Sequence, residues 1–177
     1  MTGARGDPAP VTARRFIRTV AAADARFMRE AIEIAHLGVR AGQSPFGACV
    51  VRDGRVIARA HNTVLRDSDP SAHAEINAVR AACAALGSHD LSGCIVYATG
   101  EPCPMCLGCC YWAHVPRIVF GSSLADSEAI GFGELPYAPA TLLSGAARPL
   151  LVEGGVLRDE CLGIFKAWQA RGGRETY

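Results

Sequence analysis

Apolar residues recur along the chain at the spacings typical of amphipathic helices. A first stripe lies between Asp24, a residue type that often caps a helix, and Gly42. It consists of Phe27, Met28, Ala31, Ile32, Ala35 and Val39. This spacing predicts a helix that begins after Asp24. Similar stripes predict a helix over residues 73–86 and a last helix over residues 157–168.

Short runs rich in β-branched residues predict strands. Residues 47–52 and 55–60 flank Asp53-Gly54, and this dipeptide favours a type I′ turn because both of its central positions need positive φ. Three more such runs follow, over residues 94–98, 117–121 and 150–152. A hairpin followed by strands that alternate with helices predicts an α/β fold, with a mixed sheet of about five strands covered by helices on both faces.

The organisation of the chain follows from its length and composition. With 177 residues, half of them hydrophobic, it is expected to form one domain over residues 21–177. Residues 1–20 are rich in Ala, Arg and Pro; a disordered or extended tail is expected there, and the scarcity of acidic residues also fits a transit peptide. Residues 122–149 are weakly patterned.

Charge and cysteine content narrow the function class. The net charge of +1 lacks the basic excess of nucleic-acid-binding surfaces, so a nucleic-acid partner is not expected. No apolar run approaches the ~20 residues that a membrane span requires. Eight cysteines occur without a secretory segment before them, which favours reduced thiols in the cytoplasm.

Two short motifs carry the candidate chemistry. Cys103 and Cys106 are three positions apart, and Pro104 between them is typical of the first turn of a helix. Alone, such a pair also fits a redox site or half of a zinc ribbon. The upstream His73-Ala74-Glu75 adds a third ligand, His73, and leaves the fourth position of a Zn²⁺ ion open for water, while Glu75 can move protons. This combination is the signature of zinc nucleobase deaminases.

Several neighbouring residues have two interpretations. Cys109 and Cys110 extend the cysteine run and could indicate an iron–sulfur cluster, and with it a metal-stabilised binding module; core packing is the simpler interpretation. Trp112 could line a pocket or belong to the core, and Asn62 could read a base or cap a turn.

The chain resembles the cytidine-deaminase superfamily, and within it the bacterial guanine deaminases. The resemblance is carried by the runs Pro45-Phe46-Gly47-Ala48, Asp69 to Glu75, Glu101 to Gly108 and Tyr111-Trp112-Ala113. It implies a three-layer α/β/α sandwich in which His73, Cys103 and Cys106 bind zinc and Glu75 is the catalytic proton carrier.

The same resemblance implies how a base is bound. Asn62 would hydrogen-bond the ring, and the backbone N–H of Ala74 would orient a ring carbonyl. Phe46 and Trp112 would form walls of the pocket. Members of this branch exchange C-terminal segments between two subunits, which implies a homodimer in which Tyr177 reaches the partner's pocket.

The resemblance therefore predicts hydrolytic deamination of a small nucleobase, guanine to xanthine with release of ammonia. At one position the chain departs from the guanine enzymes. They have an acidic residue after Gly-Phe that reads the amidine edge of the base, whereas this chain has Gly133 there and Glu134 one place later. Cytosine, an aminotriazine, a nucleoside such as guanosine or cytidine, and an adenosine in tRNA stay open as alternative substrates.

Overall fold

The protein is built around one five-stranded mixed sheet. The computed structural model describes residues 13–172, 175 and 176. The strands are β1 (Gly47–Arg52), β2 (Arg55–His61), β3 (Cys94–Gly100), β4 (Arg117–Ser122) and β5 (Leu151–Glu153). Their order is β2-β1-β3-β4-β5, with β1 antiparallel to both neighbours and with parallel pairing from β3 to β5. The predicted sheet is confirmed.

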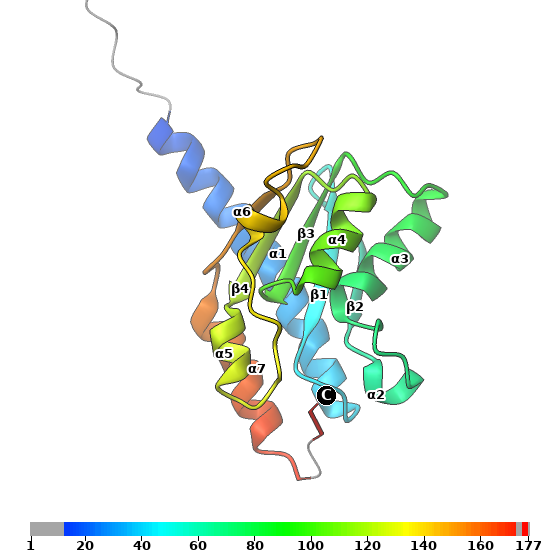
Figure 1. Cartoon of the computed structure of the whole chain (residues 1–177). Coiled ribbons are helices and arrows are strands. Elements are labelled where there is room, and N and C mark those ends of the chain that lie inside the picture. Colours follow the sequence, from blue (N-terminus) through cyan, green and yellow to red (C-terminus); the bar gives the residue numbers. More distant parts are fainter. Residues whose placement is uncertain (1–12, 173–174, 177) are drawn as a thin grey trace, which may run out of the picture.

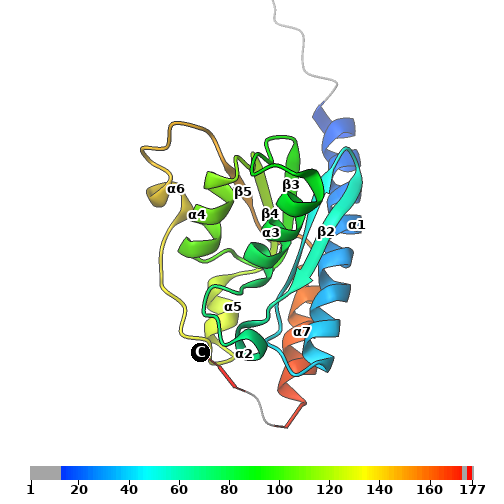
Figure 2. The same cartoon turned by 90° about the vertical axis from the view of Figure 1, so that its right-hand side faces the viewer.

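Helices cover both faces of this sheet, which makes the molecule a three-layer sandwich (Figures 1 and 2). The long helices are α1 (Ala13–Arg40), α3 (Ala74–Leu86), α4 (Pro104–Trp112) and α7 (Arg158–Gln169). Figure 2 shows α3 and α4 on one face and α1 and α7 on the other. The predicted α/β/α architecture is therefore also confirmed.

The predicted hairpin turn has the expected backbone. Asp53 and Gly54 adopt φ values of 50° and 71°, so both central residues have the positive φ of a type I′ turn. The turn brings β1 and β2 into antiparallel register, with Gly47 opposite His61. The residues that follow His61 therefore lie at the same end of the strands as the beginning of β1.

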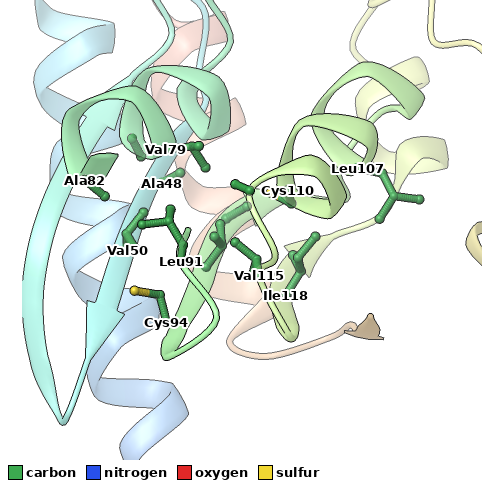
Figure 3. Packing of buried hydrophobic residues seen from close by; sticks show 14 of the residues in the cluster. Ala48, Val50, Val79, Ala82, Leu91, Cys94, Leu107, Cys110, Val115 and Ile118 are labelled. Carbon is green, nitrogen blue, oxygen red and sulfur yellow. The ribbon is translucent and has the colours of Figure 1, made fainter. Parts of the chain in front are cut away.

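The core between the sheet and the pair α3–α4 is made of small and aliphatic side chains. Figure 3 shows Ala48 and Val50 of β1 packed towards Val79 and Ala82 of α3. Leu107 and Cys110 of α4 are fully buried in the same cluster, which Ile118 of β4 and Leu91 complete.

The expected cap at Asp24 is wrong. Helix α1 already begins at Ala13, so residues 13–20 of the expected tail belong to a helix, while residues 1–12 lie outside the described part of the chain. Asp24 is instead 5% exposed inside this helix. Its carboxylate accepts hydrogen bonds from the Tyr97 hydroxyl, at 2.7 Å, and from the Arg117 guanidinium, at 2.8 and 2.9 Å. The residue therefore ties α1 to β3 and β4.

Three short helices lie in segments that show no clear periodicity: α2 (Val64–Asp67), α5 (Leu124–Glu128) and α6 (Pro139–Leu142). Helix α5 begins at Ser123, whose side chain forms a capping box with Asp126. Across residues 13–172, 175 and 176, no helix combines the length and the hydropathy that crossing a membrane demands.

Candidate active site

The predicted metal ligands stand at the beginnings of two helices on the same face of the sheet. His73 immediately precedes α3 and Cys103 immediately precedes α4, and both have extended backbone conformations typical of helix caps. Pro104 occupies the first turn of α4, as predicted. Because the first N–H groups of a helix have no partner within it, both helices direct partial positive charge towards the site.

The three ligand atoms have the separations of a tetrahedral zinc site. His73 Nδ1 lies 3.7 Å from Cys103 Sγ and 3.6 Å from Cys106 Sγ. Zinc–sulfur and zinc–nitrogen bonds of ordinary length, at a tetrahedral angle, place such atoms about 3.6 Å apart. Among the described residues, these three form the one group of His, Cys, Asp or Glu side chains whose donor atoms converge closely enough to hold a metal ion. The donor set therefore fits Zn²⁺, and it leaves one coordination position for water.

The electrostatics of the two thiols favour metal binding. A hydrogen bond from the Cys106 thiol, assisted by His73, lowers the pKa of Cys103 to about 4, although burial opposes this shift. The same hydrogen bond and burial raise the pKa of Cys106 well above its ordinary value. Cys103 is thus the thiolate that is ready to bind a cation, and a bound cation would ionise Cys106 as well.

Glu75 lies beside the ligands, in the first turn of α3. It is 8% exposed, and burial raises its pKa to about 7, although His73 opposes the shift. A carboxyl group whose pKa lies near neutrality can both accept and release a proton at that pH. Glu75 lines the same pocket as His73 and Cys103 and is electrostatically coupled to both, while its role beside a bound metal stays a prediction.

A pocket of about 290 Å³ opens onto these groups. Its lining comprises Phe46, Gly47, Asn62, His73, Glu75, Gly100, Glu101, Cys103, Pro104, Met105, Phe132, Gly133, Glu134 and Leu135. The rings of Phe46 and Phe132 meet edge to face with centroids 5.0 Å apart, so the two aromatic residues form a rigid part of the wall.

The structure brings most of the predicted substrate-binding residues to this pocket. Phe46 and Asn62 line it, and Ala74, buried and first in α3, lies between two residues that do. Asn62 also accepts a hydrogen bond from the Val64 N–H at 3.1 Å, so the turn-capping interpretation holds together with the pocket position.

Two predicted positions have a different outcome. The prediction that Trp112 is a wall of the pocket is wrong within one chain: its side chain is 75% exposed at the last residue of α4 and does not line the cavity. Trp112 is the last residue of α4 and therefore stands at the opposite end of this helix from Cys103. Tyr177 lies outside the described residues.

The extra cysteines of the run belong to packing. Cys110 is fully buried in the core on this face, and Cys109 packs against the same cluster (Figure 3 labels Cys110). Within the described chain, neither joins the converging donors of His73, Cys103 and Cys106. This is the core role that the helical spacing predicted.

An acidic residue does reach the pocket at the place where the chain departs from the guanine enzymes. Glu134 lines the cavity, while the neighbouring Gly133 offers open space in place of a side chain. Burial, with the negative charge of Cys103, raises the pKa of Glu134. No motif singles out the further wall residues Met105 and Leu135. Met105 is an apolar residue in the first turn of α4, and Leu135 lies in an irregular segment, where periodicity does not reveal which side chains turn inward.

Comparisons with known proteins agree with this geometry. A family model of the cytidine and deoxycytidylate deaminase zinc-binding region matches residues 21–122. Guanine deaminase from Bacillus subtilis (strain 168) is 37% identical over 152 residues, which cover 85% of this chain and 97% of that protein. The tRNA-specific adenosine deaminase of the same organism is 36% identical over 155 residues, covering 82% of this chain and 88% of that protein.

A solved structure of guanine deaminase from Nitrosomonas europaea is similar throughout, with a TM-score of 0.75 and 29% identity, covering 96% of this chain and 100% of that chain. The region matched by the family model contains His73, Cys103, Cys106 and Glu75. The chain therefore belongs to the family of zinc-dependent cytidine and deoxycytidylate deaminases.

Proposed function

We propose that this protein hydrolyses guanine to xanthine and ammonia. The observation that carries the proposal is the buried Glu75 carboxyl group, which lines the pocket together with two of the three converging metal ligands, His73 and Cys103. The similarity to guanine deaminases supports the choice of base. A pocket of about 290 Å³, at the small end of ligand sites, suits a free base better than a nucleotide.

His73, Cys103 and Cys106 would hold a zinc ion, which would supply a bound water molecule that loses its proton near neutral pH. Glu75 then moves the protons of the reaction. Its carboxylate takes one proton from the water and delivers it to the ring nitrogen next to the carbon that carries the amino group. The same carboxylate then takes a second proton from the hydroxyl group that is now attached to this carbon and delivers it to the amine, which leaves as ammonia. One water is consumed, the C–N bond breaks and a C–O bond forms.

The remaining pocket residues orient the ring. Phe46 and Phe132 present aromatic surfaces, and Asn62 at the end of β2 offers an amide that can hydrogen-bond the base. The N–H of Ala74 lies at the helix terminus, where it can donate to a ring carbonyl. Glu134 supplies the acceptor for an N–H of the base that Gly133 cannot supply.

Ammonia release from a panel of free bases, nucleosides and aminotriazines tests the proposal. We expect the zinc-loaded protein to act on guanine in preference to guanosine, cytosine, cytidine and aminotriazines. Glu75→Gln should keep zinc and lower turnover by about 10²–10⁴-fold or more, because the amide cannot carry the proton. Glu33→Gln, on the exposed side of α1, is the matched control. A Glu75→Gln variant that turns guanine over at the wild-type rate would contradict the mechanism.

The similarity to a tRNA-specific adenosine deaminase makes tRNA editing the second candidate. It requires the same metal chemistry on a base extruded from RNA. The near-neutral charge of the chain offers no excess of cations for a phosphate backbone. Incubation with tRNA, followed by measurement of inosine, separates the two functions: inosine without xanthine formation from guanine would favour this candidate.

We further propose a cytoplasmic homodimer. Cysteine ligands need a reducing compartment, and the cysteines of the described chain are free. Trp112 and Leu142 are 75% and 53% exposed on neighbouring helices α4 and α6, an apolar surface that a second copy would cover. Thr176 lies beside Gly131, which directly precedes the pocket residue Phe132, and exchange of C-terminal segments between two copies would bring Tyr177 to a partner's pocket. Light scattering of the full chain measures the oligomeric state.

A further inference from the structure

The base-binding and metal-binding sides of the pocket are joined by one closed loop. The chain leaves β2 at His61, passes through α2 and enters α3 after His73. Asn62 and His73 stand at the two ends of this excursion, and both line the pocket. The contacts between the two ends of this loop therefore set the distance between Asn62, which would orient the ring, and His73, which would bind the metal.

Asn77 lies at this closure. Its Nδ2 atom is 3.2 Å from the carbonyl oxygen of His61, 2.9 Å from Thr63 Oγ1 and 3.1 Å from the carbonyl oxygen of Ala72. The two N–H groups of this amide are thus shared among three acceptors, two at the beginning of the loop and one at its end. The arrangement requires a donor at this position, because the opposing groups are two carbonyl oxygens and a hydroxyl.

The backbone around Asn77 is equally well fixed. The Thr63 N–H donates to the carbonyl oxygen of Ala72 at 2.9 Å, and the Asn77 N–H donates to that of His73 at 2.9 Å. The Asn62 N–H donates to the carbonyl oxygen of Phe46, at 3.0 Å, which ties the same strand end to the other side of the pocket. Asn77 is half-buried, lines no part of the cavity and serves no role in the proton transfers described above.

We propose that Asn77 is a positioning residue: its amide holds Asn62 and His73 at the separation that lets a ring lie over the metal. The part of this role that concerns Asn62 rests on the proposed function. Asn77 does not line the cavity, so it acts through the backbone carbonyl groups of His61 and Ala72 and the side-chain hydroxyl of Thr63. Its removal should loosen the position of the ring more than it weakens the fold.

Asn77→Asp is the decisive variant, because it keeps the shape of the side chain and replaces the N–H donors by an acceptor. We expect kcat/KM on guanine to fall by about tenfold or more, chiefly through a higher KM, because a closure held by three hydrogen bonds opens when its donor becomes an acceptor. Zinc content should stay near one per chain. Asn77→Ala, which removes the donor without adding charge, should show the same pattern.

Val79→Ala is the matched control, since Val79 lies on the same helix, is 4% exposed and packs only in the core. It should lower thermal stability while leaving KM unchanged. If Asn77→Asp and Val79→Ala lose activity only in proportion to their loss of folded protein, Asn77 is an ordinary structural residue and the proposal is overturned.

A second readout does not depend on the substrate. Amide hydrogen exchange at Thr63, whose N–H closes the loop, should become about tenfold faster in Asn77→Asp and not in Val79→Ala, while exchange at Val96 in the central strand stays unchanged. If the wild-type protein releases no ammonia from guanine, the proposed function fails, but this exchange pattern still reports the closure. Unchanged exchange at Thr63 overturns the positioning role whatever the substrate is.

Discussion

The two faces of the sheet are built from different side chains. The core under α3 and α4 contains Ala48, Ala74, Ala78, Ala82 and Ala98, whereas the core under α1 and α7 contains Phe27, Tyr97, Phe132 and Trp168. Small side chains let α3 lie close to the sheet, so that its first turn meets the first turn of α4. On the opposite face, large aromatic rings and the Asp24–Arg117 ion pair hold α1 and α7 against the sheet.

The two faces therefore have different roles in the protein. The alanine-rich face carries the metal ligands and Glu75 at helix beginnings, where little adjustment is possible. The aromatic face meets the pocket at Phe132, whose ring packs on Phe46 and on Trp168, with centroids 5.0 and 5.3 Å away. Glu134 follows on the same segment. Substitutions at the helix beginnings of the first face should therefore change chemistry. Those on the connecting segment should change selectivity, and those on the second face should change stability.

The largest effect is expected from loss of a metal ligand. His73→Ala removes the one nitrogen donor of the site, and we expect its zinc affinity to fall by more than the 10–100-fold that loss of an outer-shell partner costs. Turnover should disappear with the metal. Zinc analysis after dialysis measures this effect, with His36→Ala on α1 as the control. A His73→Ala variant that retains one zinc per chain would show that the ligand set is different.

A smaller effect, confined to substrate recognition, is expected at Glu134. Glu134→Gln removes the charge that strengthens a hydrogen bond to a ring N–H, which corresponds to about 1.5–3 kcal/mol, or about a 10–100-fold loss in kcat/KM. Zinc content and thermal stability should not change. Steady-state kinetics on guanine measure the loss.

Gly133 provides the matching gain of function. A Cβ at this position meets no atom within 4 Å, so a carboxylate can be introduced without strain. We expect Gly133→Asp, made in the Glu134→Gln background, to recover a large part of the lost kcat/KM, because the guanine enzymes have their acidic residue at this place. Wild-type kinetics in Glu134→Gln alone would instead exclude Glu134 from base recognition.

The sequence was informative where local chemistry determines structure. The metal ligands and Glu75 could be predicted because each is fixed by a short motif at a helix start, and the hairpin because Asp53-Gly54 needs a particular backbone. Trp112 could not be placed, since the pattern does not tell which way the last residue of a nine-residue helix turns. The buried ion pair of Asp24 and the hydrogen bonds of Asn77 were not predicted for another reason: their partners, such as Arg117 and His61, are distant in sequence and become neighbours only after folding.

The smallest effect on activity, and a clear effect on stability, is expected from Asp24→Asn. Burial raises the pKa of Asp24, but hydrogen bonds from Arg117 and Tyr97 and the charge of Arg117 outweigh it, so the pKa is lowered overall. A carboxyl group with a depressed folded-state pKa stabilises the protein above its unfolded-state pKa of about 4 and loses this contribution as pH falls through the lower folded-state value. The variant should therefore be less stable than wild type at pH 7 by about 2 kcal/mol, the size of a charge-assisted hydrogen bond.

The dependence on pH separates this ion pair from a general packing defect. The difference in unfolding free energy between wild type and Asp24→Asn, measured by urea titration, should shrink as the pH is lowered below about 4. Val79→Ala, which changes no titratable group, should destabilise the protein by an amount that does not depend on pH in this way. Asp24→Asn should keep its zinc and its KM at neutral pH, because the residue belongs to the aromatic face. A changed KM would show that the two faces are coupled through the sheet. It would contradict the assignment of catalysis to one face and stability to the other.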